Sequence, residues 1–275
     1  MESNNCTTLV VTSGKGGVGK TTTTANLGAG LALRGNRVLV IDADIGLRNL
    51  DVVMGLENRV VYDLVQAIEG VCRVQQAMIR DKVVNNLYLI PAAQTRDKNA
   101  VNGQQMCDLC AELKPEFDFI IIDSPAGIEQ GFKNAIAPAD RAILVTTPEV
   151  SAIRDADRII GLVEAEGIPT PELILNRVRV EMMKQKDMMS TEDILSLLSV
   201  PLLGLVPEDD GILISTNRGI PAVHNTKIKS GQAYRRIAAR VDGEDIPFPD
   251  MSSRNGLFNK IRSRVGLMWR VQGNA

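Results

Sequence analysis

Eight consecutive residues near the N-terminus have the types and spacing needed to hold phosphate. They fit the pattern G-x-x-x-x-G-K-[ST], with Thr22 directly behind them, and are Gly14, Lys15, Gly16, Gly17, Val18, Gly19, Lys20 and Thr21. Glycines let the backbone turn tightly, so that successive N–H groups can surround an anion. In this pattern Lys20 reaches the β- and γ-phosphates and the Thr21 hydroxyl binds Mg²⁺. The sequence therefore predicts a site for a nucleoside triphosphate and magnesium.

Three carboxylates stand at the ends of predicted strands. Asp42 and Asp44 follow one apolar run, and Asp123 follows another. A strand that ends in aspartate can deliver its carboxylate to magnesium or orient a water beside the γ-phosphate. Aspartates after strands also commonly cap the next helix, and the residue types alone do not separate these roles. Gly127, a little beyond Asp123, can bring its backbone N–H close to the γ-phosphate because it has no Cβ.

The elements that must position these residues are short apolar runs separated by helical stretches. Continuous apolar strands are typical of a parallel sheet that is covered on both faces. The predicted strands are 9–11, 37–41, 87–90, 117–122, 142–146, 173–175 and 202–206. The stretch 23–32 predicts a helix whose N-terminus faces the phosphates. The predicted fold class is therefore α/β, a mostly parallel twisted sheet with helices on both faces, which binds ligands beyond the carboxyl ends of its strands.

Composition and charge narrow the possible classes. The 275 residues are 44% hydrophobic and 23% charged, ordinary values for a globular protein with a sizeable core. Aromatic residues make up 3%, which argues against surfaces that stack single-stranded nucleic acid. The single histidine, His224, excludes a histidine-rich metal site, and Cys107-x-x-Cys110 lacks a second pair at metal-ligand spacing. With no apolar run near about 18 residues and no signal-peptide pattern, we expect a soluble or peripherally attached protein.

The C-terminal segment differs from the rest of the chain in charge. From residue 251 onward there are five basic residues and no acidic one, so a net charge of −2 for the chain leaves −7 on residues 1–250. We expect a nucleotide-binding domain over 1–241, a linker over 242–253 and an amphipathic helix over 254–271. At 100° per residue, six side chains of this helix form an apolar arc. The arc is Leu257, Phe258, Ile261, Val265, Met268 and Trp269. Arg262 and Arg264 flank this arc, and Lys260 lies on the opposite side.

Such a helix can either dock on its own domain or lie on a membrane surface. Basic flanks, a terminal aromatic residue and the lack of acids favour the membrane. Anionic lipid contributes about 1 kcal/mol for each nearby Lys or Arg. One short helix then binds weakly and reversibly, whereas two helices tethered in a dimer gain from their effective concentration.

Three motifs together resemble the MinD/ParA family of deviant Walker-A ATPases. They are K-G-G-V-G-K-T-T, D-A-D-I-G-L-R-N-L-D and D-S-P-A-G-I-E. The resemblance implies an ATP- and Mg²⁺-dependent hydrolase in which Lys15 crosses to the nucleotide of a second copy, while Lys20 binds its own. It further implies that Asp44 orients the attacking water, and that Asp42 and Asp123 organise the metal site. A solvated surface lysine is the alternative for Lys15.

Adenine recognition is implied by the same resemblance. Asn176-Arg177 ends one predicted strand and Pro207-Glu208-Asp209 follows another. By themselves these residues indicate only a polar strand end and a turn. In the family, the asparagine side chain and the Pro-Glu-Asp loop surround the base, which makes these five positions candidate ATP-binding residues.

Further motifs resemble the branch of the family that places the division septum. They are R-N-L-D, V-V-Y-D-L, T-R-D-K and P-E-V-S-A-I-R-D-A-D-R. The resemblance implies a homodimer that forms with ATP, sits on the membrane through its tails and leaves on hydrolysis. It also implies a MinC-like division inhibitor and a MinE-like activator, with residues 149–157 as a partner surface on an otherwise solvated helix. The expected place is the cytoplasm, at the inner face of the cell membrane, or the stroma and inner envelope of a plastid.

Other functions compete for the same loop. A ParA-like DNA-segregation ATPase needs a basic surface on the folded domain, but the positive excess is confined to the tail, so no nucleic-acid partner is expected. An ATP-driven electron donor resembling the nitrogenase iron protein needs cluster thiolates near the D-S-P-A-G run, but no cysteine follows Cys110. A catalytically silent membrane anchor would not require Lys20, Thr21, Asp44 and Asp123 to be intact.

Overall fold

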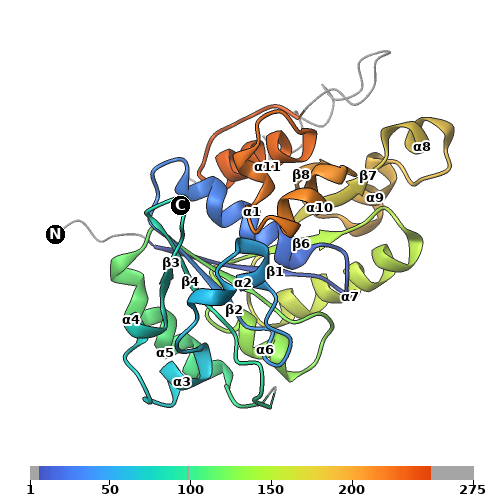
Figure 1. The fold of residues 1–275 in the computed structure, drawn as a ribbon. Helices are drawn as coiled ribbons and strands as arrows, with labels where there is room; N and C mark the ends of the chain where they lie inside the picture. The colour runs from blue at the N-terminus through green and yellow to red at the C-terminus, as the bar shows by residue number, and fades with distance from the viewer. Residues whose placement is uncertain (1–5, 98, 249–275) are drawn as a thin grey trace, which may run out of the picture.

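A computed structural model describes residues 6–97 and 99–248 of the chain (Figure 1). Its central feature is one sheet with the strand order β3-β4-β2-β5-β1-β6-β7-β8. The strands are β1 (Thr7–Thr12), β2 (Val38–Asp42), β3 (Ile79–Arg80), β4 (Leu87–Ile90), β5 (Phe119–Asp123), β6 (Arg141–Thr146), β7 (Glu172–Val178) and β8 (Leu202–Pro207). All neighbouring strands pair in parallel except β3 with β4. The predicted tail helix 254–271 lies outside the described residues.

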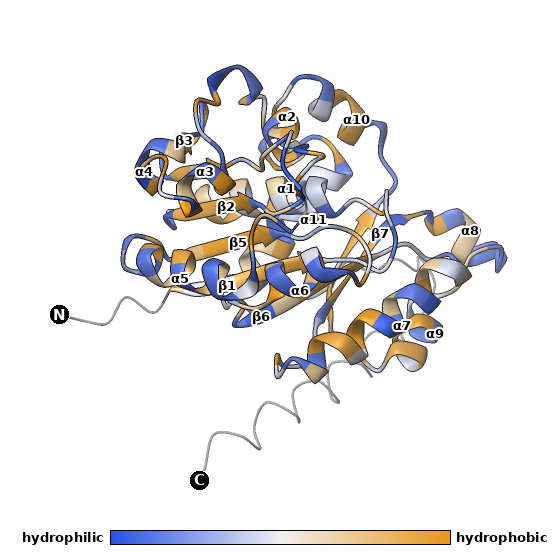
Figure 2. Cartoon of the chain, turned by 90° about the horizontal axis from the view of Figure 1, so that it is seen from below, coloured by the Kyte–Doolittle hydropathy of each residue, from blue (hydrophilic) through white to orange (hydrophobic). Residues whose placement is uncertain are grey.

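Helices cover both faces of the sheet, as Figures 1 and 2 show. The longer ones are α1 (Lys20–Ala32), α5 (Gly103–Leu113), α7 (Val150–Ala165) and α11 (Lys229–Val241). The shorter ones are α2 (Leu50–Met54), α3 (Leu64–Ile68), α4 (Val74–Ala77), α6 (Gln130–Ile136), α8 (Val180–Gln185), α9 (Thr191–Leu198) and α10 (Asp210–Asn217), with 3₁₀ turns at Glu57–Arg59, Lys114–Glu116 and Ala222–His224. This arrangement confirms the predicted α/β fold class.

The core is divided by the sheet into two layers. Side chains of successive strand residues point to opposite faces, so Val10 packs in one layer and Val11 in the other. The first layer lies under α5, α6, α7 and α9, and the second under α1, α2 and α11. The residues of β2 and β5 are buried throughout, which explains why their sequences are continuously apolar up to the final aspartate.

Helix α1 lies between the sheet and α11 and approaches both closely. A Cβ at Gly28 would lie 2.6 Å from Val40 Cγ1, and one at Gly30 would lie 2.8 Å from Ala238 Cβ. Glycine lowers helix propensity by about 1 kcal/mol relative to alanine, so these glycines are explained by packing. Close packing on two sides gives the glycine-rich loop before α1 a rigid support.

Element boundaries differ slightly from those predicted. The helix predicted over 23–32 begins at Lys20, because the glycine-rich loop itself ends in the first helical turn. The strand predicted over 173–175 extends over Glu172–Val178 and includes polar residues at its end. Strand β3 was not predicted, since two residues carry no periodic signal. None of the described helices is long and apolar enough to cross a membrane.

Candidate functional site

The glycine-rich loop joins the carboxyl end of β1 to the start of α1. Gly17 and Gly19 have positive φ values of 77° and 102°, a left-handed conformation that favours glycine. Gly19 is the N-cap of α1 and has no side chain to cap the helix, so the first N–H groups of α1 remain available to an anion. Lys20, the first residue of α1, is buried with an exposed fraction of 8%. The loop therefore has the backbone and the charge that a bound phosphate needs.

Two other elements hold this loop from either side. A Cβ at Gly14 would lie 2.3 Å from the backbone oxygen of Asp155 in α7, so only glycine allows this contact. On the other side, the Asn176 side-chain amide donates a hydrogen bond to the Val18 carbonyl at 2.7 Å. Arg177 has a φ of 55°, and its N–H donates to Asn176 Oδ1 at 2.9 Å. Asn176, predicted at the adenine, thus also braces the phosphate loop.

Asp42 and Asp123 form a buried pair beside the loop. They are direct neighbours in the register of β2 and β5. Burial, and then the charge of Asp123, raise the pKa of Asp42 to about 7. Burial also raises the pKa of Asp123 to about 6, although the charge of Lys20 and the hydroxyls of Thr21 and Thr24 act in the opposite direction. Burial makes it costly for both carboxyls to be ionised at once. A divalent cation would offset that cost, so the pair fits a metal site.

The pair predicts a specific pH dependence for the nucleotide-free chain. Because both pKa values are raised, the folded chain retains protons that the unfolded chain loses, so the pair lowers stability as pH rises from about 4 to 7. Asp123→Asn removes one charge and relieves Asp42. As pH rises from about 4 to 7, we therefore expect the melting temperature of this variant to fall less than that of the unmodified chain.

The measurement is thermal unfolding without nucleotide or metal at several pH values. Asp108→Asn is the matched control, because Asp108 is exposed on α5 and its removal leaves the pair intact. A constant difference between Asp123→Asn and the unmodified chain across this pH range would contradict the prediction.

Asp42 also organises the loop that follows β2. Its two carboxylate oxygens accept backbone N–H groups from Asp44, Asn49 and Leu50 at 3.0, 3.2 and 3.1 Å. Leu50 is the first residue of α2, so the carboxylate also serves the positive end of that helix. Asp44 lies in this loop, half-buried, and its charge is among the minor causes that raise the pKa values of Asp42 and Asp123. The three predicted carboxylates therefore lie together.

Arg48 fixes the far end of the same loop. It has a φ of 43°, which is unusual for a residue with a side chain. Its Nε lies 2.7 Å from Asp51 Oδ2, and the Asp51 side chain is fully buried. A charge-assisted hydrogen bond to a buried carboxylate can hold such a strained backbone. Asp51 is not predicted from the sequence as a functional residue, because an aspartate in a short helix gives no signal of this pairing.

Gly127, in the segment after β5, contacts the start of the glycine-rich loop. It has a φ of 93°, and its N–H donates a hydrogen bond to the Ser13 carbonyl at 3.4 Å. The Ser13 hydroxyl in turn donates to the Lys15 carbonyl at 2.9 Å. The segment after β5 is thus joined to the start of the phosphate loop. The predicted contact of the Gly127 N–H with a phosphate stays a prediction.

The two lysines of the loop have different surroundings. In contrast to buried Lys20, the Lys15 side chain is 47% exposed. Its Nζ lies 3.4 Å from Ser151 Oγ and 3.7 Å from Glu149 Oε2, at the start of α7. Such exposed ion pairs contribute about 0–1 kcal/mol. Lys15 is therefore at the surface and only weakly held within its own chain.

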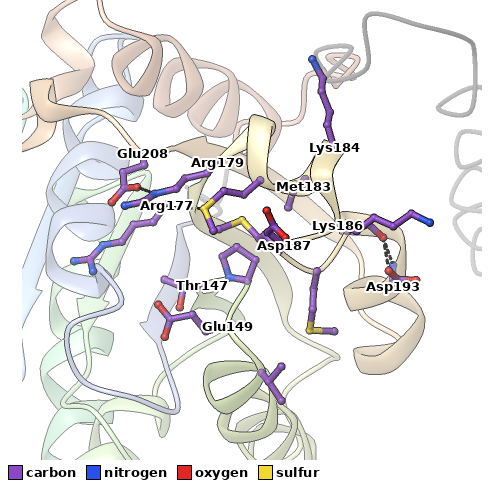
Figure 3. Close-up of a pocket in the computed structure, with 16 residues that line it drawn as sticks. Thr147, Glu149, Arg177, Arg179, Met183, Lys184, Lys186, Asp187, Asp193 and Glu208 are labelled. Atoms are coloured by element: carbon purple, nitrogen blue, oxygen red, sulfur yellow. Dashed lines mark hydrogen bonds and ion pairs between the residues drawn. The ribbon is translucent and has the colours of Figure 1, made fainter.

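A cavity of about 1120 Å³ lies beside the predicted adenine residues (Figure 3). Its wall includes Arg177 and Glu208, and Arg179 forms an ion pair with Glu208 that lowers the pKa of that carboxyl. Four methionines also line it: Met182, Met183, Met188 and Met189. Their sequence does not indicate this position, because methionines are common in cores.

Asp209 has a separate, structural position. It is the N-cap of α10, where its Oδ1 accepts the Gly211 N–H at 2.8 Å. Its Oδ2 accepts both the N–H and the hydroxyl of Ser230, each at 3.1 Å. Asp209 therefore joins α10 to the start of α11. The preceding residue, Glu208, lines the cavity.

These features define a class of protein. A glycine-rich loop joins the first strand of a parallel sheet to the first helix, which begins with a lysine. Two strands that end in aspartate lie beside this loop. This is the arrangement of P-loop nucleoside-triphosphate-binding proteins. The residues present fit ATP with magnesium: Lys20 and the free helix N-terminus suit the phosphates, and the Asp42–Asp123 pair suits the cation.

Comparisons with known proteins identify the family. The model of the CobQ/CobB/MinD/ParA nucleotide binding domain matches residues 9–222. The septum site-determining protein MinD of Synechocystis is 57% identical over 259 residues, which cover 94% of this chain and 97% of that protein. The chain therefore belongs to the MinD family of septum site-determining proteins, a branch of the MinD/ParA nucleotide-binding ATPases.

Solved structures agree with this assignment. The MinC:MinD cell division protein complex of Aquifex aeolicus matches with a TM-score of 0.83 and 45% identity, covering 91% of this chain and 100% of that chain. MinD from Pyrococcus horikoshii, complexed with Mg-ADP, matches with a TM-score of 0.79 and 32% identity, covering 86% of this chain and 96% of that chain.

Proposed function

We propose that the chain is an ATPase that dimerises with ATP, binds the membrane through its C-terminal helix and places the division site by recruiting a division inhibitor. The observation that carries the proposal is the contrast between the two lysines of one loop. Lys20 is buried beside the site, whereas Lys15 is exposed and weakly paired. This contrast supports assigning Lys20 to the chain's own nucleotide and Lys15 to that of a second copy.

Each residue of the site has a defined task in hydrolysis. Lys20 would bind the phosphates, and Thr21, Asp42 and Asp123 would hold magnesium. The bound metal would neutralise charge at the phosphate oxygens. Asp42 holds the loop that carries Asp44 through its three backbone hydrogen bonds. Asp44 orients the attacking water, which is a matter of position more than of proton affinity in phosphoryl transfer.

The proposed partners follow from the family to which the chain belongs. Because the Aquifex relative forms a MinC:MinD complex, we propose a MinC-like inhibitor as a partner of this chain, and a MinE-like activator of hydrolysis. Exposed Arg154 and Asp157 of α7 offer charged groups for these partners. α7 also touches the phosphate loop at Gly14, which gives a bound partner direct access to the site.

Sedimentation with anionic vesicles tests the proposal. We expect the full chain to pellet with vesicles in the presence of ATP and Mg²⁺, and to remain in the supernatant with ADP, because only the dimer presents two weak helices together. Truncation before Met251 should abolish pelleting. Vesicles without anionic lipid are the control for the basic flanks. Equal pelleting with both nucleotides would contradict the switch.

A further inference from the structure

The segment directly after α11 is held against the domain. α11 ends in a Schellman motif, in which the Gly243 N–H donates to the Arg240 carbonyl at 3.1 Å and the Glu244 N–H to the Ala239 carbonyl at 2.9 Å. Gly243 has the φ of 93° that this motif requires. The chain therefore turns back at the end of the helix and does not continue along the helix axis.

Arg240 holds the residues beyond this turn. Its guanidinium donates to the carbonyls of Ile246 and Pro247 at 2.9 and 3.1 Å, and to the Leu203 carbonyl in β8 at 2.9 Å. It also lies 4.0 Å from the centre of the Phe248 ring. Burial lowers the pKa of Arg240 to about 10, which still leaves it charged at neutral pH. The Arg240 guanidinium thus connects β8, the carbonyls of Ile246 and Pro247, and the Phe248 ring.

Arg34 holds the beginning of the same segment. It follows α1, and its guanidinium pairs with Asp242 at 2.7 Å and with Glu244. The Asn36 side-chain amide adds a hydrogen bond to Asp242 at 3.0 Å. These contacts come from the end of α1 that is remote from the phosphate loop. Since α1 has 13 residues, they lie about 20 Å from that loop at 1.5 Å per residue.

We propose that Arg34 and Arg240 form a clasp on residues 242–248 that fixes where the C-terminal tail leaves the domain and shortens its tether. The inference rests on the proposed membrane-binding tail over 254–271. With the clasp closed, only residues 249–253 separate the last clasped residue from the predicted helix, in place of the whole linker 242–253.

The shorter tether strengthens the binding of the second tail. Five residues reach at most about 18 Å and twelve about 43 Å, at up to 3.6 Å per residue. Beyond the optimal length, effective concentration falls roughly as the −3/2 power of linker length, so an open clasp lowers it about fourfold. The clasp therefore makes cooperation between two weak tails more effective without any added lipid contact.

Two variants remove the Arg240 side of the clasp, and one matched variant leaves it closed. Arg240→Gln removes the guanidinium, and Phe248→Ala removes the ring while keeping every charge. Arg236→Gln is the control, because Arg236 lies on the same helix and its replacement removes the same charge without touching the contacts described above. Thermal melts of all three full-length variants show whether the domain is folded.

The first readout is cleavage by the glutamate-specific protease Glu-C after Glu244, followed by mass spectrometry in the absence of lipid. A protease needs a locally open segment, so we expect both clasp variants to release the 1–244 fragment about tenfold faster than the control. Release at the control rate would overturn the clasp.

The second readout is the affinity of the ATP-bound chain for anionic vesicles. We expect the clasp variants to bind about twofold more weakly than the control, because Arg34 still holds Asp242 and Glu244 and only residues 245–253 are freed. Faster cleavage with unchanged affinity would overturn the tethering role and leave the proposed function intact. A complete lack of ATP-dependent binding by the unmodified chain would instead refute the proposed function, and the tethering role with it.

Discussion

Lys15→Ala is expected to yield a folded protein that binds ATP and stays monomeric. The side chain is 47% exposed, and its contacts with Ser151 and Glu149 are peripheral, so its loss costs little stability. Lys20 remains in place for the chain's own phosphates. Losing a charge-assisted contact across an interface costs about 2–5 kcal/mol, and a symmetric dimer loses it twice. We therefore expect ATP-dependent dimerisation to weaken by at least about a thousandfold.

Light scattering with size-exclusion chromatography measures this effect in the presence of ATP and Mg²⁺. Lys227→Ala is the matched control, because Lys227 is also exposed and is not part of the phosphate loop. Nucleotide binding is measured separately with a fluorescent ATP analogue. A dimer of Lys15→Ala at the concentration at which the control dimerises would refute the role of Lys15 in the partner's site.

The parts of this molecule that the sequence predicts are those encoded in contiguous residues. The glycine-rich loop lies within one short run, and the acidic strand ends follow apolar runs directly, so residue order alone places them at one edge of the sheet. The structure brings Lys20, Asp42 and Asp123 together there, as expected. The predicted fold class follows from the same local patterns.

The parts that the sequence does not predict depend on contacts between distant residues. The bond from Asn176 to Val18 spans 158 positions, and nothing near either residue indicates it. The clasp is similar, because Arg34 and Arg240 meet only after α1 and α11 have packed together. The proline and charge of 242–253 predict a linker, and that pattern gives no signal of the contact between Asp242 and Arg34, 208 positions away.

These distant contacts share a mechanical consequence. Asn176 and Asp155 fix the phosphate loop from two sides, while Asp42 and Arg48 fix the loop that carries Asp44. These contacts restrain the backbone around the site, as preorganisation requires. In such a site the substitution of one positioning side chain affects the chemistry more than the fold.

Asp44→Ala is expected to separate dimerisation from hydrolysis. Asp44 is half-buried, and its charge is among the minor causes that raise the pKa values of Asp42 and Asp123, so its removal makes that pair easier to ionise. The main-chain bonds from Asp44 to the Asp42 carboxylate and from Leu47 to the Asp44 carbonyl do not need its side chain. The loop should keep its shape, and ATP-dependent dimers should form normally.

Hydrolysis by this variant should nevertheless fall by about 10²–10⁴-fold, the range lost when a side chain that positions or activates the nucleophile is removed. Phosphate release under single-turnover conditions measures the effect, and Asp108→Ala, an exposed aspartate on α5, is the matched control. If hydrolysis dissolves the dimer as proposed, the variant should also stay on anionic vesicles after ATP addition while the control returns to solution. Phosphate release at the control rate would show that the attacking water is oriented by another group.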